Sequence, residues 1–170
     1  MNTLVVGDLH LKQEFVLPRI DELLANDAKI GRVVFLGDAC DDWGANEADE
    51  LNAMEFYAKW VREHRERGMQ IDVLLGNHDF CYVRGKRGPG SIMSIMRNLR
   101  TILEDALQAK VACAVGPYLC SHAGVTGVWA KRFLSDVPAD AAAIAQRLNE
   151  MLADSSHWGD LDSCPPSRGG

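Results

Sequence analysis

Four short motifs rich in metal-binding side chains follow one another along this chain of 170 residues. They are Gly7-Asp8-Leu9-His10, Gly37-Asp38-Ala39-Cys40-Asp41, Gly76-Asn77-His78-Asp79 and Ser121-His122-Ala123-Gly124. Carboxylate, imidazole and amide ligands in this mixture suit Mn, Fe, Zn or similar first-row cations better than Ca. The motifs therefore predict a site for divalent metal ions, and phosphoryl transfer as the chemistry that such a site performs.

Each motif follows a short apolar run, the pattern of a buried strand that ends at a turn. Polar side chains at the ends of successive strands meet at one edge of an open α/β sheet, where such sheets bind ligands. Taken singly, Asp8, Asp38 and Asn77 read equally well as turn or cap residues, and His122 as a buried histidine with a partner. The four motifs in order favour one shared site.

Strands and helices alternate through the first half of the sequence, which predicts βαβ units and a mainly parallel sheet. Strands are expected at about 2–7, 32–36, 70–75, 111–115 and 117–121, and helices at about 16–28, 46–67, 91–108, 126–134 and 138–153. The basic, glycine-rich segment 82–90 is expected to be a loop, either facing the substrate or serving as a solvated connection.

Composition describes an ordinary globular protein of one domain, with 47% apolar and 25% charged residues. The net charge of −6 disfavours a nucleic-acid surface without excluding one. Five cysteines without a CxxC pair indicate a reducing compartment, and neither a signal peptide nor a transmembrane run is evident. We therefore expect a cytoplasmic protein with no membrane partner.

The motifs resemble those of the calcineurin-like metallophosphoesterase superfamily, namely DxH, GDxxD, GNH(D/E) and a later histidine, over about residues 1–124. The segments at 121–125, 158–160 and 168–169 are similar to the phage and bacterial type of serine/threonine protein phosphatase. This resemblance implies an α/β fold, an α/β/β/α sandwich of two β-sheets flanked by helices. We expect residues 1–170 to be one catalytic domain, truncated at its C-terminus and with an incomplete second sheet.

The resemblance also assigns the metal ligands. The first ion would be held by Asp8, His10 and Asp38, and the second by Asp38, Asn77 and His122. We expect two divalent transition-metal ions. Mn is the first choice for both, and Fe or Zn are the alternatives. A divalent ion lowers the pKa of bound water to about 7, and the resulting hydroxide would attack phosphorus.

His78 would be the general acid, oriented by Asp41, because an imidazolium held by a carboxylate is a good proton donor near neutral pH. The protein phosphatase branch has an arginine that binds phosphate after GDxxD, where this chain has Asp42. We expect Asp42 to point away, and Arg84 or Arg168 to bind the phosphate group instead.

The branch also has a final metal-binding histidine in a Gly-His segment, which this sequence lacks. His64 lies on a charged helical face and is expected to be solvated, whereas His157 is a spare candidate ligand. We expect the missing ligand to lie beyond Gly170.

These features predict a metal-dependent phosphoesterase that hydrolyses phosphomonoesters of a protein or a small molecule. A phosphodiesterase or a nucleotide pyrophosphohydrolase with the same dinuclear site is the alternative. A non-catalytic metal-binding domain is a further alternative.

Overall fold

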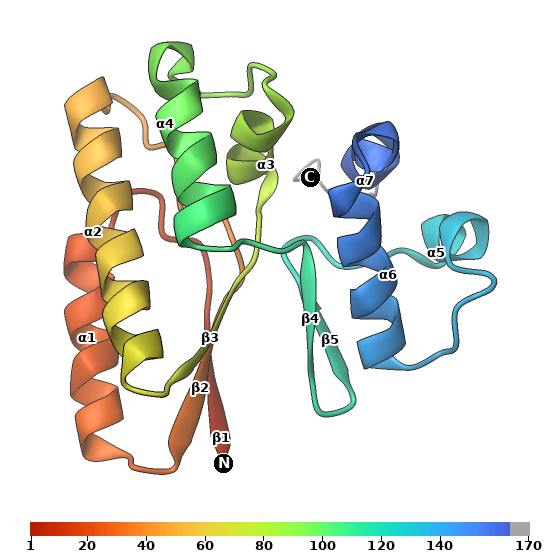
Figure 1. Cartoon of the computed structure of the whole chain (residues 1–170), viewed down its shortest axis with the longest axis horizontal. Helices are drawn as coiled ribbons and strands as arrows, with labels where there is room; N and C mark the ends of the chain where they lie inside the picture. Colours follow the sequence, from red (N-terminus) through yellow and green to blue (C-terminus); the bar gives the residue numbers. More distant parts are fainter. Residues whose placement is uncertain (164–170) are drawn as a thin grey trace.

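The computed structural model describes residues 1–163 and contains two sheets with helices on their outer faces (Figure 1). The first sheet is parallel, in the order β1 (Asn2–Val6), β2 (Ile30–Phe35) and β3 (Gln70–Val73). The second is an antiparallel hairpin of β4 (Ala112–Val115) and β5 (Tyr118–Ser121). The α/β fold and the βαβ order predicted from the sequence are confirmed.

Helices α1 (Gln13–Asn26) and α2 (Glu47–Glu66) lie side by side over one face of the first sheet (Figure 1). Alternate residues of β2 take part in two different cores, since successive side chains of a strand point to opposite faces. Val33 and Phe35 belong to the core shared with these helices, whereas Val34 packs with Cys113 of the hairpin.

Helix α6 (Ala141–Ala153) covers the outer face of the hairpin (Figure 1). Leu148 and Met151 of this helix join Ala112 of β4 and Trp129 of α5 (Gly127–Phe133) in a separate buried cluster. The layers therefore run helix, sheet, sheet, helix, which is the predicted order.

The helices differ from the prediction in two ways. The segment predicted as one helix at 91–108 forms three consecutive pieces: η1 (Met93–Ile95), α4 (Met96–Thr101) and the π-helical η2 (Ile102–Ala106). Three short helical segments were not predicted: α3 (Asn77–Arg84), η3 (Ser155–His157) and α7 (Trp158–Asp162). Each spans too few residues to show a helical period in the sequence.

Within residues 1–163, no helix combines the length and the apolar character that a membrane span requires.

His64 was predicted to be solvated, and this was wrong. Its ring stacks on Trp60 with centroids 3.9 Å apart, and its Nε2 lies 3.1 Å from Oδ1 of Asp21. The side chain is only 13% exposed. The contact with Asp21 depends on the packing of α1 against α2, which the sequence of one helix does not reveal.

The loops after β2 and β3 cross at two glycines. Gly37 has φ +111°, and a Cβ there would lie 2.3 Å from the amide nitrogen of Gly76. A Cβ on Gly76 would lie 2.0 Å from Oδ1 of Asp38. Neither position has room for a side chain, so the crossing sets where the Asp38 carboxylate stands.

We therefore predict that Gly76→Ala displaces Asp38 and lowers the free energy of unfolding by about 1–3 kcal/mol, the usual cost of overpacking. Gly76 has φ −90°, so the change tests contact and not backbone strain. Urea denaturation measures the free energy of unfolding of the variant. Gly127→Ala is the matched control, because a Cβ there meets open space and should leave stability nearly unchanged. Equal stability of the two variants would contradict the prediction.

Candidate active site

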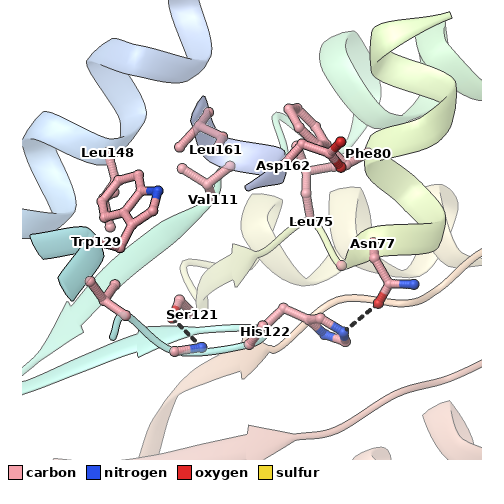
Figure 2. Close-up of a pocket in the computed structure, with 14 residues that line it drawn as sticks. Leu75, Asn77, Phe80, Val111, Ser121, His122, Trp129, Leu148, Leu161 and Asp162 are labelled. Atoms are coloured by element: carbon pink, nitrogen blue, oxygen red, sulfur yellow. Dashed lines mark hydrogen bonds between the residues drawn. The ribbon is translucent and has the colours of Figure 1, made fainter. Parts of the chain in front are cut away.

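The ends of the strands bring the predicted ligands together. Ligand atoms of Asp8 and His10 after β1 and of Asp38 after β2 all lie within 4.8 Å of one another. Asn77, the first residue of α3, has its Oδ1 3.2 Å from Nε2 of His122, which follows β5 (Figure 2). The five residues predicted as metal ligands therefore form one cluster.

Asp38 is the centre of this cluster, and its side chain is only 6% exposed. Oδ1 accepts a hydrogen bond from the backbone amide of His78 at 2.9 Å. Oδ2 faces both imidazoles, 3.3 Å from Nε2 of His122 and 3.8 Å from Nε2 of His10. One carboxylate oxygen is thus held by the backbone, and the other is shared between two ring nitrogens.

Both imidazoles have their other nitrogen engaged by the main chain. Nδ1 of His10 lies 2.8 Å from the carbonyl oxygen of Asp41, and Nδ1 of His122 lies 3.1 Å from that of Leu36. Because a carbonyl only accepts, Nδ1 carries a hydrogen in both rings and Nε2 is the nitrogen that faces Asp38, where it donates when the imidazole is protonated and offers a lone pair when it is neutral. Metal-ligating histidines are oriented in this way. The donor set therefore fits divalent first-row cations.

The charges in the cluster favour a cation at the same place. The hydrogen bond to Asp38 raises the pKa of His122. Burial would raise the pKa of Asp38, but the hydrogen bonds from His122 and from the His78 amide outweigh it, so that the pKa of this carboxyl lies below its ordinary value. The Asp38 carboxylate is anionic and ready to bind positive charge.

A second chain of hydrogen bonds runs beside the cluster. Nδ1 of His78 lies 2.9 Å from Oδ2 of Asp41, and the hydroxyl of Tyr82 donates to Oδ1 of Asp41 at 2.5 Å. Burial and this hydrogen bond raise the pKa of Tyr82, so the hydroxyl stays protonated as a donor. The ring of His78 makes an edge contact with that of His10, with centroids 5.1 Å apart.

Tyr82 is a site residue that the sequence analysis missed, since it placed this residue in a loop. His78 and Tyr82 are four residues apart on α3, so they lie on the same helical face and both reach Asp41. The signal was a tyrosine one turn after the GNHD motif, and it is visible only once the helix is known.

Two buried carboxyl groups accept hydrogen bonds from the backbone of the loops after β2 and β3. Asp79 accepts hydrogen bonds from the amides of Ala39, Cys40 and Gly76 at 2.9–3.0 Å, which ties the loop after β2 to the loop after β3. Burial raises the pKa of Asp79. The sequence analysis gave neither this residue nor Glu50 a supporting role.

Glu50 of α2 is fully buried and accepts the amide of Asp41 at 3.1 Å, while its Oε2 has no hydrogen-bond partner among residues 1–163. Burial, with the like charges of Asp41 and Asp79 nearby, raises the pKa of Glu50 to about 7. Glu50 therefore holds the Asp41 loop at the cost of a poorly solvated carboxyl group.

Of the two arginines predicted to bind phosphate, the structure describes Arg84. Arg84 forms an ion pair with Asp162, and its guanidinium stands 5.5 Å from the centre of the Phe80 ring. Its role toward phosphate stays a prediction, and Arg168 lies outside the described residues. Asp42 forms an ion pair with Lys12 at the surface. Nδ1 of His157 lies 3.1 Å from Oδ2 of Asp160.

Two cavities adjoin the cluster. One, of about 100 Å³, is mostly apolar and reaches Asn77 and His122 (Figure 2). The other, of about 230 Å³, is lined by His10, Asp41, Asp42, Trp43, His78, Pro89 and Gly90. The end of the basic segment 82–90 therefore faces the site.

Comparison with known proteins identifies the family of the chain. The family model of the calcineurin-like phosphoesterases matches residues 1–168. No curated protein sequence gives a significant match.

Among solved structures, the chain is similar to the cold-active protein tyrosine phosphatase of a psychrophilic Shewanella species, with TM-score 0.55 and 17% identity over 91% of this chain and 52% of that one. A second structure of a cold-active protein tyrosine phosphatase gives TM-score 0.52 and 16% identity over 89% and 52%. The chain thus spans about half the length of these proteins. At such identities the likeness shows the fold alone.

The buried carboxyl of Glu50 predicts a pH-dependent stability. A carboxyl whose pKa is raised on folding stabilises the fold below its unfolded pKa, and this contribution is lost as the pH rises through about 7. Glu50→Gln should therefore gain stability relative to the unmodified protein as the pH rises from about 4.5 to about 7, by at most about 1.4 kcal/mol per pH unit. Urea denaturation across this range measures the difference. Exposed Glu55→Gln on the same helix is the control and should show no such trend. A difference for Glu50→Gln that stays constant or falls with pH would contradict the assignment.

Proposed function

The chain belongs to the calcineurin-like phosphoesterase family and is a metal-dependent phosphoesterase, and from this premise we propose that it hydrolyses phosphomonoesters. One observation carries the proposal: the His78–Asp41 pair stands directly beside a cluster of ligands that converge on Asp38. A proton donor next to a cation site is what the cleavage of an unactivated ester requires, so this arrangement supports the proposal.

We propose the five clustered residues as metal ligands. Asp8, His10 and Asp38 would hold one ion, and Asp38, Asn77 and His122 the other. When bound, two divalent ions of Mn, or of Fe or Zn, would neutralise phosphate charge and supply an activated water. The shared Oδ2 of Asp38, which faces both imidazoles, supports the role of this residue as the common ligand.

His78 would donate a proton to the leaving oxygen. Its Nδ1 is committed to Asp41, so Nε2 is the atom that can carry a proton to the substrate. Asp41 is only 2% exposed and is held in turn by Tyr82 and by the Glu50 contact to its amide. These contacts fix the direction of the imidazole before the substrate arrives.

The substrate would be a phosphorylated protein or a small phosphomonoester. Release of phosphate from para-nitrophenyl phosphate in the presence of Mn²⁺ tests the proposal. The same assay with bis-para-nitrophenyl phosphate is the comparison. Faster turnover of the diester would favour the phosphodiesterase alternative and overturn ours.

Asp38→Asn should lose bound metal and abolish turnover. The Asn side chain has one acceptor oxygen and one NH₂ group where Asp38 has two acceptor oxygens. Its NH₂ group would face either the His78 amide, which is itself a donor, or the proposed cation site, where Oδ2 of Asp38 now stands. Metal analysis after gel filtration in Mn²⁺, together with phosphate release, measures the loss. Asp105→Asn on an exposed position is the control. Full metal content and turnover in Asp38→Asn would refute the ligand assignment.

His78→Asn should keep its metal and slow hydrolysis by about 10²–10⁴-fold for esters with poor leaving groups. The loss should be smaller for para-nitrophenyl phosphate, whose leaving group needs little protonation. Tyr82→Phe should show the same dependence on the leaving group but a smaller loss, because it removes only one hydrogen bond to Asp41. If His78→Asn instead loses metal, His78 is a ligand and not the acid.

A further inference from the structure

The larger of the two cavities beside the cluster contains the proposed proton donor. It is lined by His10, Asp41, Asp42, Trp43, His78, Pro89 and Gly90 and measures about 230 Å³. The smaller, apolar cavity of Figure 2 reaches Asn77 and His122, but His78 is not among the residues that line it. A general acid protonates the atom that departs, so the leaving group must lie on the His78 side.

Trp43 also lines this cavity, and it is aromatic and 86% exposed. Its backbone is nevertheless fixed. The amide of Trp43 donates to Oδ1 of Asp42 at 2.9 Å, and Oδ2 of Asp42 pairs with Lys12. The indole is therefore presented from an anchored loop.

The other side of the cavity is anchored to the acid itself. A Cβ on Gly90 would lie 3.5 Å from the Cβ of Asp41, so this backbone packs against the carboxylate that orients His78. The amide of Ile92 donates to the Tyr82 hydroxyl at 2.9 Å, which holds the end of the turn in the same network. Pro89 and Gly90 thus stand at a set place relative to the acid.

No lysine or arginine among residues 1–163 lines this cavity, so an anionic leaving group finds no basic side chain of the lining to pair with. Two of the lining residues are acidic: Asp41 contacts His78 and Tyr82, and Asp42 pairs with Lys12. A pyrophosphate or nucleotide leaving group would bring negative charge to this lining. A neutral alcohol or phenol would not.

The volume of the cavity also limits the size of the leaving group. Pockets for drug-sized ligands hold about 300–1,000 Å³, and this cavity, at about 230 Å³, lies below that range. It suits a single ring bonded directly to the ester oxygen. An indole face also favours an aromatic ring over an aliphatic one, because aromatic pairs gain about 0.5–1.5 kcal/mol beyond the area they bury.

We propose that Trp43 and Pro89 form a leaving-group subsite beside His78 for a neutral aromatic ring, so that the protein prefers aryl phosphomonoesters. This inference rests on the proposed function and names its substrate class. The bond between phosphorus and the aryl oxygen breaks, and that oxygen keeps the electron pair and takes the proton from Nε2 of His78. A water molecule adds its oxygen to phosphorus and releases a proton, which restores the charge balance.

Kinetics with Trp43→Ala test the subsite. We expect kcat/KM for phenyl phosphate to fall about three- to tenfold, and kcat/KM for ethyl phosphate to change less than about twofold. Trp43→Phe should keep most of the preference. Tyr118→Ala removes another exposed aromatic side chain, one that lines a different cavity, and should leave kcat/KM unchanged for both substrates. Equal losses on both esters in Trp43→Ala would overturn the inference.

A binding measurement separates this inference from the proposed function, since it needs no turnover. Calorimetric titration in Mn²⁺ would compare benzylphosphonate with cyclohexylmethylphosphonate, a probe of similar size without aromatic character. We expect benzylphosphonate to bind more tightly, and the advantage to disappear in Trp43→Ala and persist in Tyr118→Ala. Benzylphosphonate binding that is unchanged in Trp43→Ala would refute the subsite even in a protein that hydrolyses no ester.

Discussion

The crossing of the loops after β2 and β3 is the constraint on which the site depends. Gly37 and Gly76 meet with no space for a side chain, and this contact places Asp38 beside the start of α3. Asp79 locks the crossing through three amide hydrogen bonds to the two loops. Its buried charge is costly, but amide donors to a carboxylate are among the stronger hydrogen bonds in proteins. The position of the Asp38 carboxylate thus depends on groups that are not themselves among the proposed ligands.

The first two strand-end loops also carry unusual backbone conformations. His10, Leu11, Asp38 and Asp41 all have positive φ, a region that side chains other than glycine seldom adopt. Such residues cost about 1–3 kcal/mol each and persist where the surroundings enforce them. Here the carbonyl of Asp38 accepts the amides of Leu9 and His10, which binds one loop to the other. The strain lies at the residues proposed for metal binding and acid catalysis, while the hydrogen bonds between the loops offset it.

The sequence was sufficient for the layers and for the position of the motifs, because apolar strands and amphipathic helices are local patterns. It was not sufficient for the groups that act through tertiary contacts. Glu50 reads as an acidic residue in the first turns of a helix, yet α2 turns it inward under Asp41. Tyr82 reads as part of a loop because α3 is only eight residues long. The identity and number of the metal ions, the roles of the site residues, the domain extent and the cytoplasmic location stay predictions.

The two cavities of the site meet at the start of α3. His78 lies at the start of α3 and faces the cavity built from the loop after β2, which contains Trp43, and from the turn at Pro89. Asn77, the neighbouring residue, faces the other cavity, which is shared with the end of β5 and with α6 (Figure 2). One helix start therefore separates the proton donor from a proposed metal ligand, and changes to the leaving-group wall need not disturb the ligands around Asp38. Trp43 and Pro89 are exposed positions of loops, where substitutions are best tolerated, so the proposed leaving-group preference can vary, whereas Gly37 and Gly76 at the crossing leave no room for a side chain beside Asp38.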